Sequence, residues 1–133
     1  MERPKYEVVT PDDGRYKPEP HELEVAEILA RHYGSVIMFL KPVDTYKVKT
    51  PDLIMNGVEW EIKSPMGKSK KYTIVDQFKK ASKQSKSIVL DCRRTLLPDD
   101  FILKQIERKL NEHKSIKRVI FIGKDEKILE IKK

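Results

Sequence analysis

The chain has 133 residues, which fits one domain and leaves little room for a second. Its 28 basic and 21 acidic side chains give a net charge of +7, which favours a polyanionic partner, nucleic acid being the commonest, although a solvated Lys-rich surface without a partner is the alternative. The single cysteine, Cys92, excludes an internal disulfide, and no Cys or His spacing is typical of a zinc site. No apolar stretch approaches the length of a membrane span, and the polar N-terminus shows no signal peptide.

The first part of the chain is rich in proline. Residues 1–20 contain four prolines and the turn sequence Asp12-Asp13-Gly14, which predicts an irregular N-terminal arm before a single domain over residues 21–133. Residues 22–33 are predicted to form a helix that ends at Gly34. Its inner face is formed by the apolar residues that recur at helical spacing, Val25, Ala26, Leu29 and Tyr33.

Three strands are predicted next. Residues 35–40 read as a buried strand, and residues 52–55 and 58–63 read as two strands joined by Asn56-Gly57. Asn-Gly between two apolar runs is a strong signal for a two-residue hairpin turn. These segments therefore predict an antiparallel hairpin that follows the first helix.

The remaining elements alternate between helices and strands. Thr73 to Asp76 resembles a capping box that opens a second helix, with Ile74, Phe78 and Ala81 on its inner face. A strand at 88–91, a third helix opened by Pro98, and strands at 119–122 and 128–131 complete the chain. The predicted order, α-β-β-β-α-β-α-β-β, indicates an α/β fold with a mixed central sheet flanked by helices.

The strand at 58–63 carries an unusual row of charges. Because side chains alternate faces along a strand, Glu59, Glu61 and Lys63 share one face, and Trp60 lies on the opposite, core-facing side. Two carboxylates and an ammonium in a row are an odd choice for stability alone. The row therefore marks a candidate site, in which Glu59 is more simply an exposed strand residue.

The hairpin brings a further carboxylate to this row. Counting outwards from a two-residue turn, Asp52 comes opposite Glu61, so the two can share a hard divalent cation, with the backbone carbonyl of Ile62 as a third ligand. Mg²⁺ is the expected ion, and Mn²⁺ could substitute for it. Lys63 could neutralise a scissile phosphate or orient the attacking water. The set predicts phosphodiester hydrolysis.

Pro51-Asp52 followed by Glu61-Ile62-Lys63 resembles the motif of the PD-(D/E)XK nuclease superfamily. The resemblance implies a restriction-endonuclease-like core, α-β-β-β-α-β, over residues 22–91, with the C-terminal helix and strands added to it. In that superfamily a glutamate on the first helix often completes the metal site, which gives the role to Glu22. The alternative is that Glu22 is favoured there by the helix dipole.

A closer resemblance is to the tRNase-like C-terminal toxin nuclease domains of contact-dependent growth inhibition (CdiA-type) proteins. It rests on several segments of residues 21–94: His21-Glu22 with Ala26, Val36 to Leu40, Thr50-Pro51-Asp52-Leu53, Gly57 with Trp60 to Ser64, Gln77 with Ala81 and Gln84, and Val89-Leu90-Asp91. The resemblance implies a metal-dependent nuclease that cuts RNA, specifically tRNA, or DNA, and an immunity protein as partner. The chain starts at its own Met1 without a delivery region, so a free-standing or mobile-element nuclease is the alternative. The implied place of action is the cytoplasm, after export if the protein is a toxin.

Other side chains are expected to support the site. Gln77 lies on the inner stripe of the second predicted helix and could hold a metal-bound water or a phosphate, or it is an ordinary edge residue. A rim that contacts phosphates is predicted from the polar and basic residues that follow the motif. Its members are Ser64, Lys68, Ser69, Lys70, Lys71, Lys80, Arg93 and Arg94. The competing functions are a non-catalytic nucleic-acid-binding module and an assembly protein of a phage or conjugative element.

Overall fold

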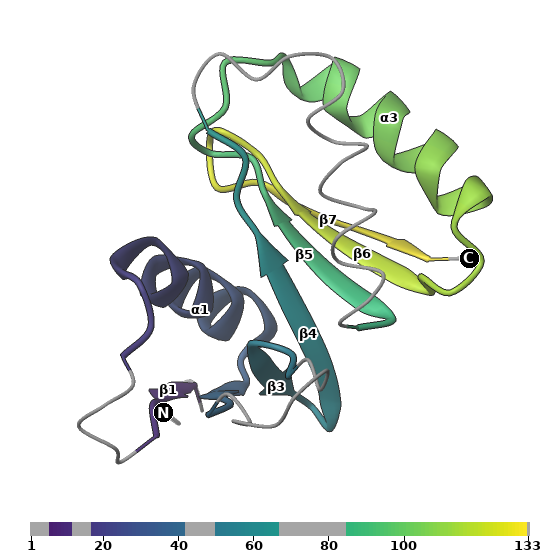
Figure 1. Cartoon of the computed structure of the whole chain (residues 1–133). Helices are drawn as coiled ribbons and strands as arrows, with labels where there is room; N and C mark the ends of the chain where they lie inside the picture. The colour runs from purple at the N-terminus through teal and green to yellow at the C-terminus, as the bar shows by residue number, and fades with distance from the viewer. Residues whose placement is uncertain (1–5, 12–16, 42–49, 67–84, 133) are drawn as a thin grey trace. The chain divides into compact units, whose positions relative to one another are not determined.

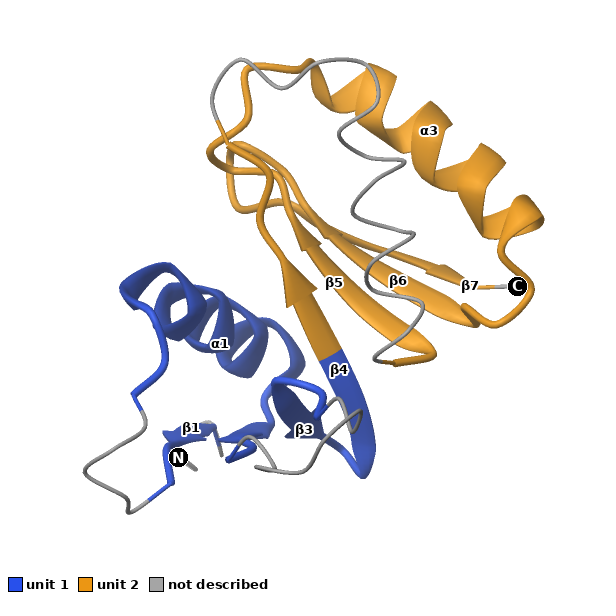
Figure 2. Cartoon of the chain, in the orientation of Figure 1, with its two compact units in different colours: residues 1–60 blue, residues 61–133 orange. Residues whose placement is uncertain are grey.

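The computed structural model describes residues 6–11, 17–41, 50–66 and 85–132. Within these ranges the chain is a mixed α/β protein with two helices and a seven-stranded mixed sheet, whose strands follow one another in the order β1 to β7 (Figure 1). It forms two compact units, residues 1–60 and 61–133, and the division falls inside strand β4 (Figure 2). The single domain over residues 21–133 stays a prediction.

The first unit contains β1 (Glu7–Val9), α1 (Pro20–Tyr33), β2 (Val36–Phe39), β3 (Leu53–Met55) and the beginning of β4 (Val58–Lys63). Strands β1 and β2 are parallel, and the next two pairs are antiparallel. The strand β1 lies inside the predicted irregular arm. It is ordered by its pairing with β2, in which Val8 lies opposite Ile37. A three-residue strand is too short to show a hydrophobic period, so the sequence did not predict it.

Helix α1 has recognisable signals at both ends. It begins at Pro20, where a missing N–H costs nothing, and the Glu22 carboxylate accepts a hydrogen bond from the Glu19 N–H at 2.8 Å. It ends at Gly34, whose φ of 60° is the left-handed conformation that glycine adopts readily. The inner residues Val25, Ala26, Leu29 and Ala30 are each 0% exposed, and the helix packs on β1 and β2. The predicted helix at 22–33 is confirmed.

The sheet of this unit has one buried face. Ile37, Leu53 and Trp60 share that face through the strand register, and all three are at most 2% exposed. Val36 and Met38, which alternate with Ile37 along β2, are each 46% exposed. The strand predicted at 35–40 to be buried is therefore buried on one face only. In β4 the burial does not alternate, because Glu61 is buried along with its neighbours Trp60 and Ile62.

The second unit contains the end of β4, β5 (Ser87–Asp91), α3 (Asp99–Glu112), β6 (Arg118–Ile122) and β7 (Ile128–Lys132). Strands β4, β5 and β6 run parallel, and β7 returns antiparallel to β6. Helix α3 lies along one face of β5 to β7 (Figure 1). The core between helix and sheet consists of Ile88, Leu90, Cys92, Ile102, Ile106, Leu110, Ile116, Val119 and Phe121.

The sequence predicted these elements with bounds that differ by a residue or two. The inner face of the C-terminal helix, Ile102, Ile106 and Leu110, is confirmed. The second predicted helix, with Thr73, Ile74, Phe78 and Ala81, lies outside the described residues. The restriction-endonuclease-like core therefore stays a prediction. Neither helix of the described ranges is long and apolar enough to cross a membrane.

Candidate active site

The hairpin that carries the candidate motif forms as predicted. Leu53 pairs with Trp60, Ile54 with Glu59 and Met55 with Val58, which is the register counted from a two-residue turn. The turn residues Asn56 and Gly57 have φ angles of 51° and 78°, the positive values that this kind of hairpin turn needs. Local chemistry thus fixes which residues of β3 and β4 face each other.

Asp52 directly precedes β3, and both its backbone N–H and its carbonyl form hydrogen bonds. Its N–H donates to the carbonyl of Trp60 at 3.0 Å, and its carbonyl accepts from the Leu40 N–H at 2.8 Å. The side chain is half-buried. The described strand pairs end at Leu53 and Trp60, so the expected pair of Asp52 with Glu61, one position further, stays a prediction.

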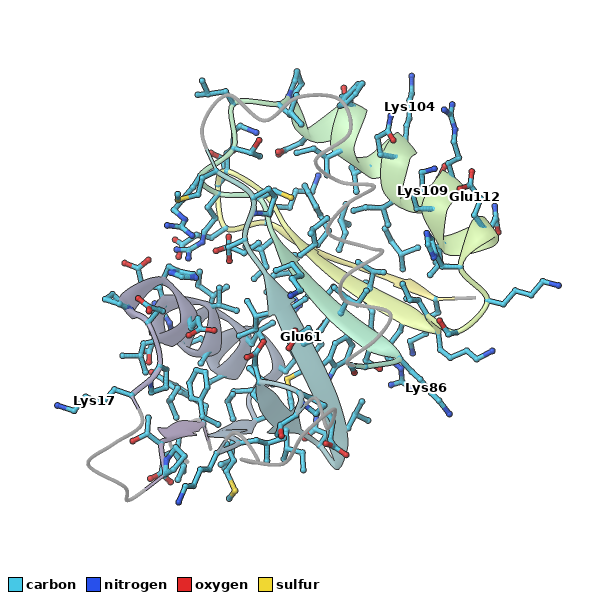
Figure 3. All side chains as sticks on the ribbon, in the orientation of Figure 1. Lys17, Glu61, Lys86, Lys104, Lys109 and Glu112 are labelled. Carbon is cyan, nitrogen blue, oxygen red and sulfur yellow. The ribbon has the colours of Figure 1, made fainter. Side chains whose placement is uncertain are left out.

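Glu61 and Lys63 form a buried ion pair on β4. The Lys63 Nζ lies 3.2 Å from the Glu61 Oε2, and the side chains of Lys63 and Glu61 are 19% and 2% exposed. Figure 3 labels Glu61 on β4. The pair confirms that these residues share one face of the strand, as alternation predicted. Glu59 is exposed and Trp60 is 2% exposed, which agrees with the expectation for both.

The pKa of Glu22 on α1 is shifted by its surroundings. Burial raises the pKa of the Glu22 carboxyl above its ordinary value, the hydrogen bond from the Glu19 backbone lowers it, and the negative charge of Asp52 raises it further. Burial is the largest of these effects, and the charge of Asp52 is a smaller one. The first unit thus holds two carboxylates whose charges interact.

A second polar group, which sequence reasoning did not anticipate, is centred on Asp91. This carboxylate is 0% exposed and accepts two hydrogen bonds from the Arg93 guanidinium, at 2.8 and 3.0 Å. The Ser64 hydroxyl donates to it at 3.4 Å. An aspartate that ends an apolar strand, with arginine two residues later, is the sequence signal that could have indicated the pair.

Two residues of the predicted phosphate rim contact Asp91. Ser64 and Arg93 both direct their side chains to Asp91, whereas Arg94 is exposed. The remaining rim residues lie outside the described residues: Lys68, Ser69, Lys70, Lys71 and Lys80. Gln77 lies outside them as well.

The donor types of the candidate residues suit a hard cation. Glu22 and Asp52 in the first unit and Glu61 in the second carry carboxylate oxygens, which Mg²⁺ and Mn²⁺ prefer over nitrogen or sulfur. No cluster of three or more His, Cys, Asp or Glu side chains close enough to hold a metal ion occurs in the part of the chain that the structure describes. The metal site therefore stays a prediction.

Comparisons with known proteins place the chain in a family. A search of curated proteins finds no match. Among solved structures, the CdiA-CT/CdiI toxin and immunity complex from Burkholderia pseudomallei contains a chain with the same fold, with a TM-score of 0.68 at 20% sequence identity over 96% of this chain and 98% of that one. The family model for the contact-dependent growth inhibition CdiA C-terminal domain matches residues 49–128. Because this match spans more than half of the chain, the protein belongs to the family of contact-dependent growth inhibition CdiA C-terminal domains.

Proposed function

We propose that this chain is a metal-dependent endonuclease toxin domain that hydrolyses phosphodiester bonds in RNA, with tRNA as the favoured substrate. The observation that carries the proposal is the buried Glu61–Lys63 ion pair, which follows directly on the hairpin that ends at Asp52. Membership of the CdiA C-terminal domain family supports it. The structural neighbour comes from a toxin and immunity complex, which supports the toxin role.

In this proposal four groups would hold one divalent cation, Mg²⁺ by default or Mn²⁺. They are the carboxylates of Asp52 and Glu61, the backbone carbonyl of Ile62 and, from α1, the carboxylate of Glu22. Such an ion would supply Lewis acidity at the scissile phosphate and lower the pKa of a water. Burial is the main cause of the raised pKa of Glu22, and a cation would offset the further contribution from the charge of Asp52.

Lys63 has a separate role in the proposal. Its ammonium compensates the buried Glu61 carboxylate at 3.2 Å. At the edge of a cation held by Glu61, the same ammonium would stabilise the negative charge that grows on the phosphate during attack. Gln77 holds the attacking water or a phosphate oxygen, and the polar rim that includes Ser64 and Arg94 contacts neighbouring phosphates.

The biological setting follows from the family. We propose that the domain is exported, acts in the cytoplasm of a target cell, and is neutralised by an immunity protein in the cell that produces it. The Burkholderia pseudomallei complex is a toxin and immunity pair of this kind. A toxin that cuts nucleic acid needs an inhibitor in the cell that makes it, because its substrate is present there too.

The test is to incubate the purified chain with unfractionated tRNA, plasmid duplex and single-stranded DNA, each with Mg²⁺, with Mn²⁺ and with EDTA. We expect tRNA to be shortened when metal is present and to stay intact in EDTA. Cleavage of the DNA substrates alone would make the protein a DNA endonuclease of the same fold. Cleavage that persists in EDTA would contradict the metal site, and no cleavage of any polymer would favour a binding module.

A further inference from the structure

Three strand ends of the second unit gather basic residues at one place. Strand β5 starts beside Lys86, β6 starts at Arg118 and β7 ends at Lys132. Ser87 pairs with Arg118, which pairs with Lys132, and the Lys117 N–H donates to the Lys86 carbonyl at 2.7 Å. We call this group the basic end, consisting of Lys86, Lys114, Lys117, Arg118 and Lys132. Figure 3 shows the Lys86 side chain extending outwards beyond β5.

Like charges meet within the basic end. Arg118 and Lys132 lie directly opposite each other in an antiparallel pair, where like charges are destabilising. Glu130 offsets part of this repulsion, with its carboxylate 3.6 Å from the Lys132 ammonium. Among the described residues, no carboxylate forms an ion pair with the side chain of Lys86, Lys114 or Lys117, which are all exposed. The gathering of exposed cations at one edge of the sheet is the observation that points to a function for the charge.

The helix dipole explains one member of the group but not the others. Lys114 follows the C-terminus of α3, where cations are favoured by the unpaired carbonyls. Lys86, Lys117 and Lys132 belong to strand ends, which carry little net dipole. A separate reason is therefore needed for the strand-end cations.

The spacing of the strand-end cations suits a chain of phosphates. Neighbouring strands lie about 4.8 Å apart, so the row from β5 through Arg118 to Lys132 spans about 10 Å. A nucleic-acid strand with an axial rise of about 3.4 Å per phosphate presents about three phosphates over that length. The next row of the same sheet joins Glu61, Ile88, Val119 and Ile131. Because side chains alternate along a strand, the Arg118 and Lys132 side chains lie on the face opposite to that of Glu61, so the basic end is a surface separate from the proposed metal site.

We propose that the basic end binds the phosphate backbone of the nucleic acid that the domain cuts. The proposal rests on the proposed function for its substrate, and adds a second binding surface to the rim predicted after the motif. Its interactions are electrostatic and independent of base sequence, so they position the polymer and do not select the bond to be cut. Salt should therefore weaken this binding steeply.

The test compares two triple variants with the same loss of charge. The first, Lys86→Gln with Lys117→Gln and Lys132→Gln, removes three cations of the basic end. The matched control, Lys17→Gln with Lys104→Gln and Lys127→Gln, removes three exposed lysines elsewhere. Binding of unfractionated tRNA is measured in EDTA, which prevents metal-dependent cleavage, over a series of salt concentrations.

We expect the first variant to lower the slope of log affinity against log salt by about 2, because each phosphate that a cation neutralises adds roughly 0.7–0.9 to that slope. At moderate salt its affinity should fall at least about tenfold, whereas the control should change the slope by less than about 1. Equal slopes for the two variants would overturn the proposal. A variant that binds tRNA like wild type but no longer binds polyglutamate would assign the surface to an acidic protein and overturn it as well.

Two further readouts separate this inference from the proposed function. If wild type cleaves no nucleic acid but the slope falls as expected, the basic end binds nucleic acid and the nuclease proposal fails alone. If wild type cleaves and the first variant binds like wild type, only the role of the basic end is refuted.

Discussion

The Glu61 carboxylate is 2% exposed and is compensated by an ammonium that is itself mostly covered. Removing one partner of a buried ion pair leaves an uncompensated charge, which can cost about 3–5 kcal/mol in a fully buried setting. Because Lys63 retains 19% exposure, the cost here is smaller. Removing Lys63 should therefore destabilise the fold through the charge left on Glu61, in addition to its proposed effect on the chemistry.

Replacing Lys63 separates these two roles. Lys63→Ala should reduce tRNA cleavage about 10²–10³-fold, the usual loss when a group that stabilises transition-state charge is removed. Lys63→Arg keeps a cation beside Glu61 and should preserve the fold, while cleavage falls because a guanidinium does not replace an ammonium at a fitted site. Lys104→Ala, at an exposed position of α3, serves as the control and should cleave like wild type. Wild-type cleavage by Lys63→Ala would refute the assigned role.

Glu22 gives a pH-dependent prediction for stability. Its pKa is raised in the folded state, so the folded protein is penalised once the carboxyl ionises: the penalty is absent below the ordinary pKa and complete above the folded pKa. Glu22→Gln should therefore raise the melting temperature at pH 7 and make no such gain at about pH 3–4, below the ordinary glutamate pKa. Glutamine can still accept the Glu19 N–H, so the start of α1 is preserved. Thermal melts across pH without metal measure this, and equal gains at both pH values would contradict it.

Cys92 is predicted to be unreactive in the folded protein. The thiol is 0% exposed, and burial together with the neighbouring Asp91 raises its pKa, so the reactive thiolate is scarce. A colourimetric thiol reagent should label the protein only after denaturant is added. Rapid labelling of the native protein at neutral pH would show that the core under α3 opens.

Contacts within one strand could be predicted from the sequence, whereas contacts between distant strands could not. Alternation along one strand was enough to place Glu61 and Lys63 on one face, and the ion pair follows. The hydrogen bond of Ser64 with Asp91 joins residues 27 positions apart in the chain, and it depends on the parallel pairing of β4 with β5. No local pattern encodes that pairing, so the rim role of Ser64 and Arg93 was assigned without knowledge of their shared partner.

At the scale of elements, the helix that carries Glu22 depends on one glycine. Gly34 has a φ of 60°, and an added Cβ there would meet no atom within 4 Å, so the cost of a side chain is purely conformational. Gly34→Ala should destabilise the fold by about 1–2 kcal/mol, and Gly34→Asn by less, because asparagine tolerates this conformation better. Denaturant unfolding of both variants measures the difference. Equal stabilities of Gly34→Ala and wild type would mean that α1 ends in another way.

Local signals recovered most of the described elements. The Asn56-Gly57 turn, the stop at Gly34 and the inner stripe of α3 each have a chemical cause within a few residues, and each prediction is confirmed. Strand β1 was missed because three residues do not establish a period, and its order comes from pairing with β2. A strand that forms only because it pairs with a distant segment cannot be predicted from local patterns in one sequence.

At the scale of the whole molecule, the α/β class, the mixed sheet and the order of the described elements could be predicted from the sequence. The parallel pairing of β4 with β5, and of β5 with β6, is a long-range choice and was not predicted in detail. The division into two units inside β4 was not predicted either, because nothing in Trp60-Glu61 marks a boundary. The candidate residues Asp52, Glu61 and Lys63 could be proposed from the sequence because they lie close together along the chain around one hairpin.

The most direct measurement is calorimetric titration of Mn²⁺ into the wild type and three variants without nucleic acid. The variants are Asp52→Asn, Glu61→Gln and, as a matched control, Glu59→Gln, which alters an exposed carboxylate two residues before Glu61 on the same strand. Wild type and Glu59→Gln should bind the ion alike, and the other two should lose at least about tenfold in affinity because each removes a carboxylate ligand. Equal binding by all four proteins, or by none, would contradict a metal site built on Asp52 and Glu61.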